Sequence, residues 1–236
     1  MIPWLDHSLH FPPPASALAE PNGLIAAGGD LSAQRLLAAY HRGIFPWYSP
    51  DEPILWWSPN PRMVLFPDEL HVPRSLAKAL RNRDYTVRFD TAFADVMTRC
   101  AAPRPGQDGT WIGPDIIAAY CKLHALGFAH SVETWIDDQL VGGLYGVAIG
   151  RVFFGESMFA LSPDASKIAF VHLVRQLQGA GFKLIDCQMQ THHLSRFGGR
   201  PIPRDDFLRH LEQHLHHASA PDLWLRELTP RDYRDD

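Results

Sequence analysis

The sequence predicts a mixed α/β (α+β) protein in two parts of unequal size. From about residue 63 onward, segments with the two-residue period of strands alternate with segments that have the 3.6-residue period of helices. Residues 1–62 are instead rich in proline, glycine and tryptophan. Because 236 residues that are 46% hydrophobic can bury one large core beside a smaller one, we expect a small N-terminal domain at 1–62 and a larger domain at 63–236.

The N-terminal part contains one clear helix. Asp30 or Ser32 can accept hydrogen bonds from its first free N–H groups. Leu36 and Tyr40 lie near one apolar face, and Gly43 ends the helix. The many prolines around this helix fix the backbone of the loops that join it to the rest.

Regular elements begin at residue 63. An apolar strand at 63–66 leads to a helix that starts near Pro73, and residues 85–89 alternate as a strand should. Two helices follow, at about 93–100 and at 114–126, the second of which stops at a glycine.

Three strands in succession come next, at 130–136, 140–149 and 151–158. A helix follows, for which Ser162 is the expected cap and Pro163 the first residue.

A strand at 182–187 and a helix at 205–216 complete the pattern, which from the strand at 85–89 onward has the order β-α-α-β-β-β-α-β-α. This order matches the GNAT acyltransferase type of fold, a mixed sheet with helices on both faces.

Composition narrows the class of protein. The net charge is −4 and the pI about 6.3, so contact with nucleic acid would need a local basic patch. Three cysteines without metal-ligand spacing are typical of reduced thiols in the cytoplasm. The first residues do not form a signal peptide, and no apolar run approaches the ~20 residues of a membrane helix. We expect a cytoplasmic protein that uses no metal, cofactor or membrane.

Polar side chains interrupt two of the apolar strands. Glu156 follows Phe153 and Phe154, and Asp186 and Gln188 lie in the strand at 182–187 or directly after it. A buried charge is costly unless it is paired or used. Two carboxylates and an amide at neighbouring strand ends therefore predict a polar reaction centre, although loop-capping carboxylates would leave the same pattern.

Nine sequence blocks, in order, point to one family. They are EPNGL at 20–24, GGDL at 28–31, RGIFPWYS at 42–49, PILWWSP at 53–59, GTWI at 109–112, LVGGLYG at 140–146, FGESMF at 154–159, ASK at 165–167 and LIDCQ at 184–188. Together they resemble the leucyl/phenylalanyl-tRNA–protein transferases. The resemblance implies transfer of Leu or Phe, with Met as a further donor, from aminoacyl-tRNA to the α-amine of proteins that begin with Lys or Arg. It also implies a role in the bacterial N-degron pathway and a small domain before a GNAT-like one.

The implied reaction is aminolysis of an activated ester, which needs no ATP, metal or cofactor. Its tasks are to orient or deprotonate the amine, to stabilise the oxyanion and to position both substrates. By the resemblance, Asp186 and Gln188 belong to this centre. Glu156 lies where the sheet meets the expected apolar slot, so we expect it to orient the aminoacyl ester or its α-amine. The alternation of a strand would put Asp186 and Gln188 on the same side. Whether Asp186 or a ribose hydroxyl of the substrate accepts the proton stays open.

Two further groups of residues are assigned to the donor substrate. A deep apolar slot for the Leu or Phe side chain is predicted from Leu144, Phe153, Met158 and Phe170, although the family often has Met at position 144. By the resemblance, Trp111 and Tyr120 contact the terminal adenosine, where a flat aromatic face suits a base.

Basic residues share one face of the helix that begins near Pro73. Arg74, Lys78 and Arg81 lie at i, i+4 and i+7, and Arg83 lies just beyond. They form a candidate tRNA phosphate strip, for which a plain solvated helix face is the alternative.

Three other functions compete with aminoacyl transfer. The first is a coenzyme A-dependent N-acyltransferase of the same fold. Its pyrophosphate needs a glycine-rich turn, but residues 162–167 read SPDASK, without glycine and with an acidic residue.

The second is a Cys–His hydrolase or metal protein built on Cys187, His192 and His193. Alternation would direct Cys187 to the opposite face of the sheet from Asp186, and adjacent histidines are poorly spaced as ligands.

The third is a non-catalytic RNA-binding module, which the acidic pI and the strand carboxylates disfavour.

Overall fold

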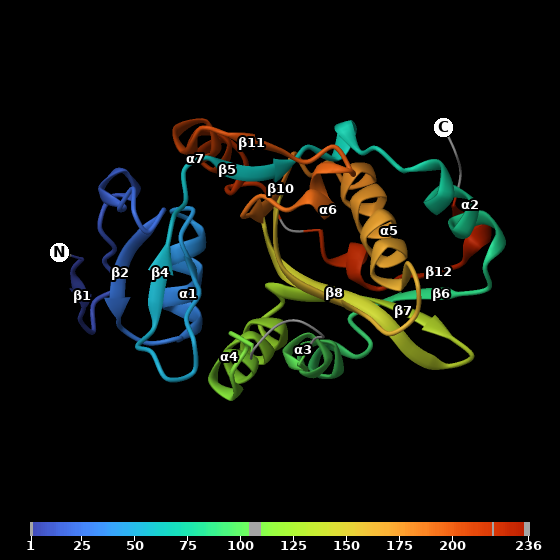
Figure 1. Ribbon diagram of the computed structural model, residues 1–236, viewed down its shortest axis with the longest axis horizontal. Helices are drawn as coiled ribbons and strands as arrows, with labels where there is room; N and C mark the ends of the chain where they lie inside the picture. Colours follow the sequence, from blue (N-terminus) through green and yellow to red (C-terminus); the bar gives the residue numbers. More distant parts are fainter. Residues whose placement is uncertain (1, 104–109, 219, 234–236) are drawn as a thin grey trace.

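The computed structural model describes residues 2–103, 110–218 and 220–233 (Figure 1). They form a mixed α/β protein with a small sheet near the N-terminus and a large sheet beside it. The predicted fold class is thereby confirmed, while the GNAT-like label stays a prediction. No helix among the described residues is long and apolar enough to cross a membrane.

The small sheet has the strand order β1-β2-β4-β3. Its strands are β1 (Trp4–Leu5), β2 (Leu24–Gly28), β3 (Phe45–Pro46) and β4 (Leu55–Trp57). Helix α1 (Ala33–Tyr40) begins at Ser32, whose side chain accepts the Arg35 N–H, whereas Asp30 pairs with the Arg35 guanidinium. Of the two predicted caps, Ser32 is the one confirmed.

The large sheet has the order β11-β5-β10-β9-β8-β7-β6-β12. The strands are β5 (Arg62–Leu65), β6 (Thr86–Phe89), β7 (Ala129–Ile136), β8 (Gln139–Ile149), β9 (Val152–Ala160), β10 (Leu184–Gln188), β11 (Arg200–Ile202) and β12 (Glu227–Leu228). All neighbours are antiparallel except β9 and β10, which run parallel. The order predicted from sequence is confirmed, but the short edge strands β11 and β12 were not predicted.

Helices cover both faces of the large sheet (Figure 1). Helices α3 (Phe93–Ala101) and α4 (Pro114–Ala125) lie on one face, and α5 (Ala165–Gly179) lies on the other. The remaining helices are α2 (Arg74–Asn82), α6 (His192–Ser195) and α7 (Arg204–His214), with short 3₁₀ turns at Pro14–Ser16, Pro67–Glu69, Pro221–Trp224 and Pro230–Asp232. Helix α1 of the small part packs against α4, so the two parts share buried core.

The start of α5 corrects one prediction. The residue before the helix is Asp164, in a left-handed conformation with φ of 63°, and not Ser162. The helix begins directly on β8, where a Cβ on Gly142 would lie 2.5 Å from the Cβ of Ala165. Tertiary packing of the helix on Gly142 therefore places its first turn, and the sequence signal of a serine followed by proline was misleading.

Parallel pairing of β9 with β10 ends early. The paired residues run from Leu184 opposite Val152 to Asp186 opposite Phe154. Beyond these pairs, the residues of β9 and β10 do not pair with each other, and they line a pocket. The candidate site lies where these two strands part.

Candidate active site

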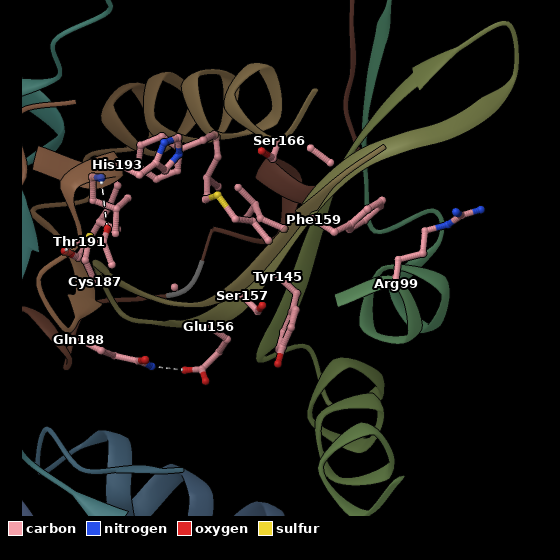
Figure 2. A pocket seen from close by; sticks show the side chains of 18 of the residues that line it. Arg99, Tyr145, Glu156, Ser157, Phe159, Ser166, Cys187, Gln188, Thr191 and His193 are labelled. Carbon is pink, nitrogen blue, oxygen red and sulfur yellow. Dashed lines mark hydrogen bonds between the residues drawn. The ribbon is translucent and has the colours of Figure 1, made fainter. Parts of the chain in front are cut away.

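The pocket between the separating strands has a volume of about 760 Å³ (Figure 2). Its wall comes from β8, β9, β10, α5, the end of α3 and the segment around α6. The apolar lining includes Leu144, Phe153, Met158, Phe159, Leu161, Phe170, Leu173, Ile185, Met189 and Leu194, and the polar lining includes Arg99, Tyr145, Glu156, Ser157, Ser166, Asp186, Gln188, Thr191 and His193. The four predicted slot residues and all three predicted catalytic residues are thus brought together.

Two β-bulges lie at the centre of this pocket. In β9, Glu156 is the extra residue, because Tyr145 and Gly146 of β8 pair with Ser157 and Gly155. In β10, Cys187 is the extra residue, because Val64 and Met63 of β5 pair with Asp186 and Gln188. A bulge re-aims side chains and breaks the two-residue alternation. The predicted directions nevertheless hold. Asp186 is bonded to Arg62 and Gln188 to Glu156, on the side of the core cluster that contains Phe45, Tyr40 and Tyr120. Cys187 packs against the other core cluster, so it lies opposite Asp186 as expected, although it also lines the pocket.

Glu156 is the centre of a hydrogen-bond cluster. Its carboxylate accepts the Tyr40 hydroxyl at 2.8 Å, the Tyr120 hydroxyl at 3.2 Å and the Gln188 Nε2 at 3.0 Å. Figure 2 shows the Gln188 and Glu156 side chains pointing toward one another. Burial, followed by the negative charge of Asp186, raises the pKa of Glu156 from 4.5 to about 8, even though these donors act to lower it. Glu156 is therefore mostly protonated at neutral pH.

Asp186 is in a different state. Its carboxylate is fully buried and forms two hydrogen bonds with the Arg62 guanidinium, at 2.8 and 2.7 Å. Oδ1 also accepts the Gln188 backbone N–H at 2.9 Å. The charge of Asp186 is thus compensated inside the protein.

The two predicted adenosine contacts lie outside the pocket wall. Tyr120 is fully buried, with its hydroxyl bonded to Tyr40 and Glu156 and its ring edge-on to Tyr145. In this conformation the Tyr120 ring offers no open face to a base. Trp111 is half-buried and packs against the core near α4. Base stacking by either residue stays a prediction.

The basic strip lies on the outer face of α2, away from the pocket. Arg74, Lys78 and Arg81 are exposed. Arg83 forms an ion pair with Asp164 at 3.2 Å and donates to the Pro163 carbonyl, so its charge is partly neutralised within the protein. Binding of tRNA by this face also stays a prediction.

Cys187 and His193 both line the pocket, so the Cys–His alternative depends on whether the Cys187 thiol can ionise. Burial, together with the charge of Asp186, raises the pKa of the Cys187 thiol. A nucleophilic cysteine requires the opposite shift, toward the thiolate. Across the described residues, no group of three or more His, Cys, Asp or Glu could hold a metal ion.

Three residues of the site were missed from sequence. Tyr40 reaches Glu156 from α1 of the small domain, and Arg62 reaches Asp186 from β5. Tyr145 lines the pocket fully buried, and its hydroxyl has no hydrogen-bond partner in the part of the chain that the structure describes. The one available signal was Arg62 itself, an arginine at the start of an apolar strand, which needs a buried partner.

An apolar slot that ends at a carboxylate and an amide defines a transferase-like site on a mixed α/β fold. The family model described as leucyl/phenylalanyl-tRNA protein transferase matches residues 64–212, and the model of its N-terminal domain matches residues 29–60. The leucyl/phenylalanyl-tRNA–protein transferase of Chromobacterium violaceum is 62% identical over 224 residues, which cover 95% of this chain and 96% of that protein. That of Laribacter hongkongensis is 61% identical over 224 residues, with the same coverage.

The chain therefore belongs to the leucyl/phenylalanyl-tRNA–protein transferase family, a family of aminoacyltransferases. Among solved structures, L-PGS from Bacillus licheniformis is similar with a TM-score of 0.39 and 10% identity, covering 72% of this chain and 57% of that one.

Proposed function

We propose that this protein transfers Leu or Phe, with Met as a third donor, from aminoacyl-tRNA to the N-terminal α-amine of proteins that begin with Lys or Arg. The product would be marked for the N-degron pathway, and the reaction would take place in the cytoplasm, where charged tRNA is found. The observation that carries the proposal is the apolar slot that ends at the Glu156–Gln188 hydrogen bond, in a chain of this family.

The slot suits the donor side chain. Leu144, Phe153 and Phe170 are buried, and Met158 is half-buried. Burial of a Leu or Phe side chain among these residues contributes roughly 1.5–3 kcal/mol to donor binding. The unbranched Met158 can adjust to both shapes.

Glu156 suits the cations of the reaction. Of the two carboxylates among the described lining residues, Asp186 is compensated by Arg62, so Glu156 is the one that can meet a substrate ammonium. A cation beside Glu156 would favour its ionised form and release a proton from the site. We infer that Glu156 positions an α-amine and that the Gln188 amide stabilises the developing oxyanion.

The coenzyme A alternative finds no support at the start of α5. The Asp164 carboxylate lies there, bonded to Lys167 at 2.8 Å and to Arg83 at 3.2 Å. A pyrophosphate at this helix end would meet a negative charge whose cationic partners are already engaged.

The test is direct transfer of label. Radiolabelled Leu-tRNA or Phe-tRNA is incubated with the protein and with two acceptors that differ only in the first residue, Arg or Ala. We expect label in the acid-precipitable protein fraction of the Arg acceptor only. Equal labelling of both acceptors would contradict the acceptor proposal. RNA binding without transfer would favour the RNA-binding module.

A further inference from the structure

Arg62 lies between the two parts of the protein and is fully buried. Its guanidinium carbon is 4.8 Å from the Phe45 ring centre and 4.6 Å from that of Phe207, so two aromatic rings pack against the guanidinium. Its Nη1 donates to the Gly43 carbonyl at 3.1 Å. The small domain and α7 therefore fix the orientation of this guanidinium.

The planar guanidinium in turn fixes Asp186. The paired bonds from Nε and Nη2 hold both carboxylate oxygens in one plane, which a lysine could not do. Asp186 is fully buried, whereas Glu156 is half-buried, so Asp186 has no exposed surface toward a substrate amine.

Asp186 in turn holds the backbone of Gln188. Its Oδ1 accepts the Gln188 N–H, and Gln188 has φ of 59°, a left-handed conformation that is costly for a residue with a side chain. In this conformation the Gln188 amide donates to Glu156. The strained backbone persists because the ion pair behind it is rigid.

We propose that Arg62 is a positioning residue for aminoacyl transfer. It acts through Asp186 to hold the Gln188 bulge, and Asp186 serves the reaction as an acceptor of hydrogen bonds and not as the base that takes the proton. This role of Arg62 rests on the proposed function. It adds to that function a link from the small domain, through Asp186, to the reacting groups.

The first experiment compares Arg62→Lys with Arg204→Lys in the full-length protein. Arg204 is a matched control, because its guanidinium is partly buried and donates to the Ser58 carbonyl of the small domain without touching Asp186. Arg62→Lys keeps the charge and loses the paired bonds. We expect kcat to fall about tenfold or more with KM for Leu-tRNA within about twofold, while Arg204→Lys keeps the wild-type kcat. Equal kcat in the two variants would overturn the proposal.

The second experiment separates hydrogen bonding from proton transfer. Arg62→Met combined with Asp186→Asn removes both charges but keeps an oxygen for the Gln188 N–H, whereas Arg62→Met combined with Asp186→Ala removes that oxygen. We expect the Asn pair to transfer about tenfold faster than the Ala pair, with the pH profile of kcat/KM unchanged from wild type. Equal rates would show that the oxygen at position 186 does not hold Gln188 for the reaction. Loss of a limb of the pH profile in the Asn pair would show that the Asp186 carboxylate takes the proton. Either result would overturn the proposal.

Two controls complete the design. Thermal melting and tRNA binding are measured for every variant, and if a double variant does not fold, the Arg62→Lys comparison decides. If the wild-type protein itself transfers no label, the proposed function fails, and the role of Arg62 fails with it. If the wild type is active and Arg62→Lys matches the control, only the positioning role fails.

Discussion

The raised pKa of Glu156 has a consequence for stability that Glu156→Gln isolates. The substitution keeps the size of the side chain and its acceptor oxygen, and removes the titration. In the folded protein the pKa is about 8, against an ordinary value of 4.5. Between these two pH values the folded state binds more protons than the unfolded state, so stability falls as pH rises from about 4.5 and stops falling above about 8.

The size of this effect follows from the shift. At 1.36 kcal/mol for each pK unit, the loss due to Glu156 is about 2 kcal/mol at pH 6 and about 4 kcal/mol at pH 8. Solvent in the pocket makes these values upper limits. The free energy of unfolding of Glu156→Gln, relative to wild type, should therefore increase by about 2 kcal/mol or less when pH is raised from 6 to 8.

Urea unfolding of both proteins at pH 6, 7 and 8 measures how the stability difference between variant and wild type changes with pH. The contributions of the other titrating groups cancel, because they are the same in the two proteins. We expect the midpoint of the variant to move up relative to wild type with each step in pH. A stability difference that does not change with pH would refute the raised pKa. A variant that is less stable than wild type at pH 8 would show that the carboxylate is stabilising and ionised.

Three further outcomes are expected. Replacing Arg74, Lys78 and Arg81 together by Ala should reduce the slope of log affinity for tRNA against log salt by up to ~3 units, as measured by filter binding, and an unchanged slope would make this face merely solvated. Tyr40→Phe, which removes one donor from the site carboxylate, should cost about 1–2 kcal/mol in urea unfolding, and no loss would show that this hydrogen bond is unimportant. Leu144→Phe should narrow the slot and lower kcat/KM for Phe-tRNA about tenfold more than for Leu-tRNA, and an unchanged ratio would place the side chain elsewhere.

Local elements could be read from the sequence because their signals are local. Helix α4 begins at Pro114 and ends next to Gly127, and strands β7, β8 and β9 follow one another across short turns. The types of residue at the site were also visible, since a carboxylate in an apolar strand is unusual wherever it is found. Local pattern failed where neighbours in space decide, as at the start of α5 and at the edge strands β11 and β12, which are only 3 and 2 residues long.

The sequence by itself determined which carboxylates and amide would meet, but not what each of them does. That depends on two bulges, which shift the pairing of the strands at Glu156 and at Cys187. It depends also on two long-range contacts, Arg62 with Asp186 and Tyr40 with Glu156, 124 and 116 residues apart. These contacts form because one domain packs on the other. They leave no periodic pattern in the sequence, so they could not be predicted from it. Only the tertiary structure therefore shows that Asp186 is paired with a buried arginine, whereas Glu156 is held by the neutral donors Tyr40, Tyr120 and Gln188.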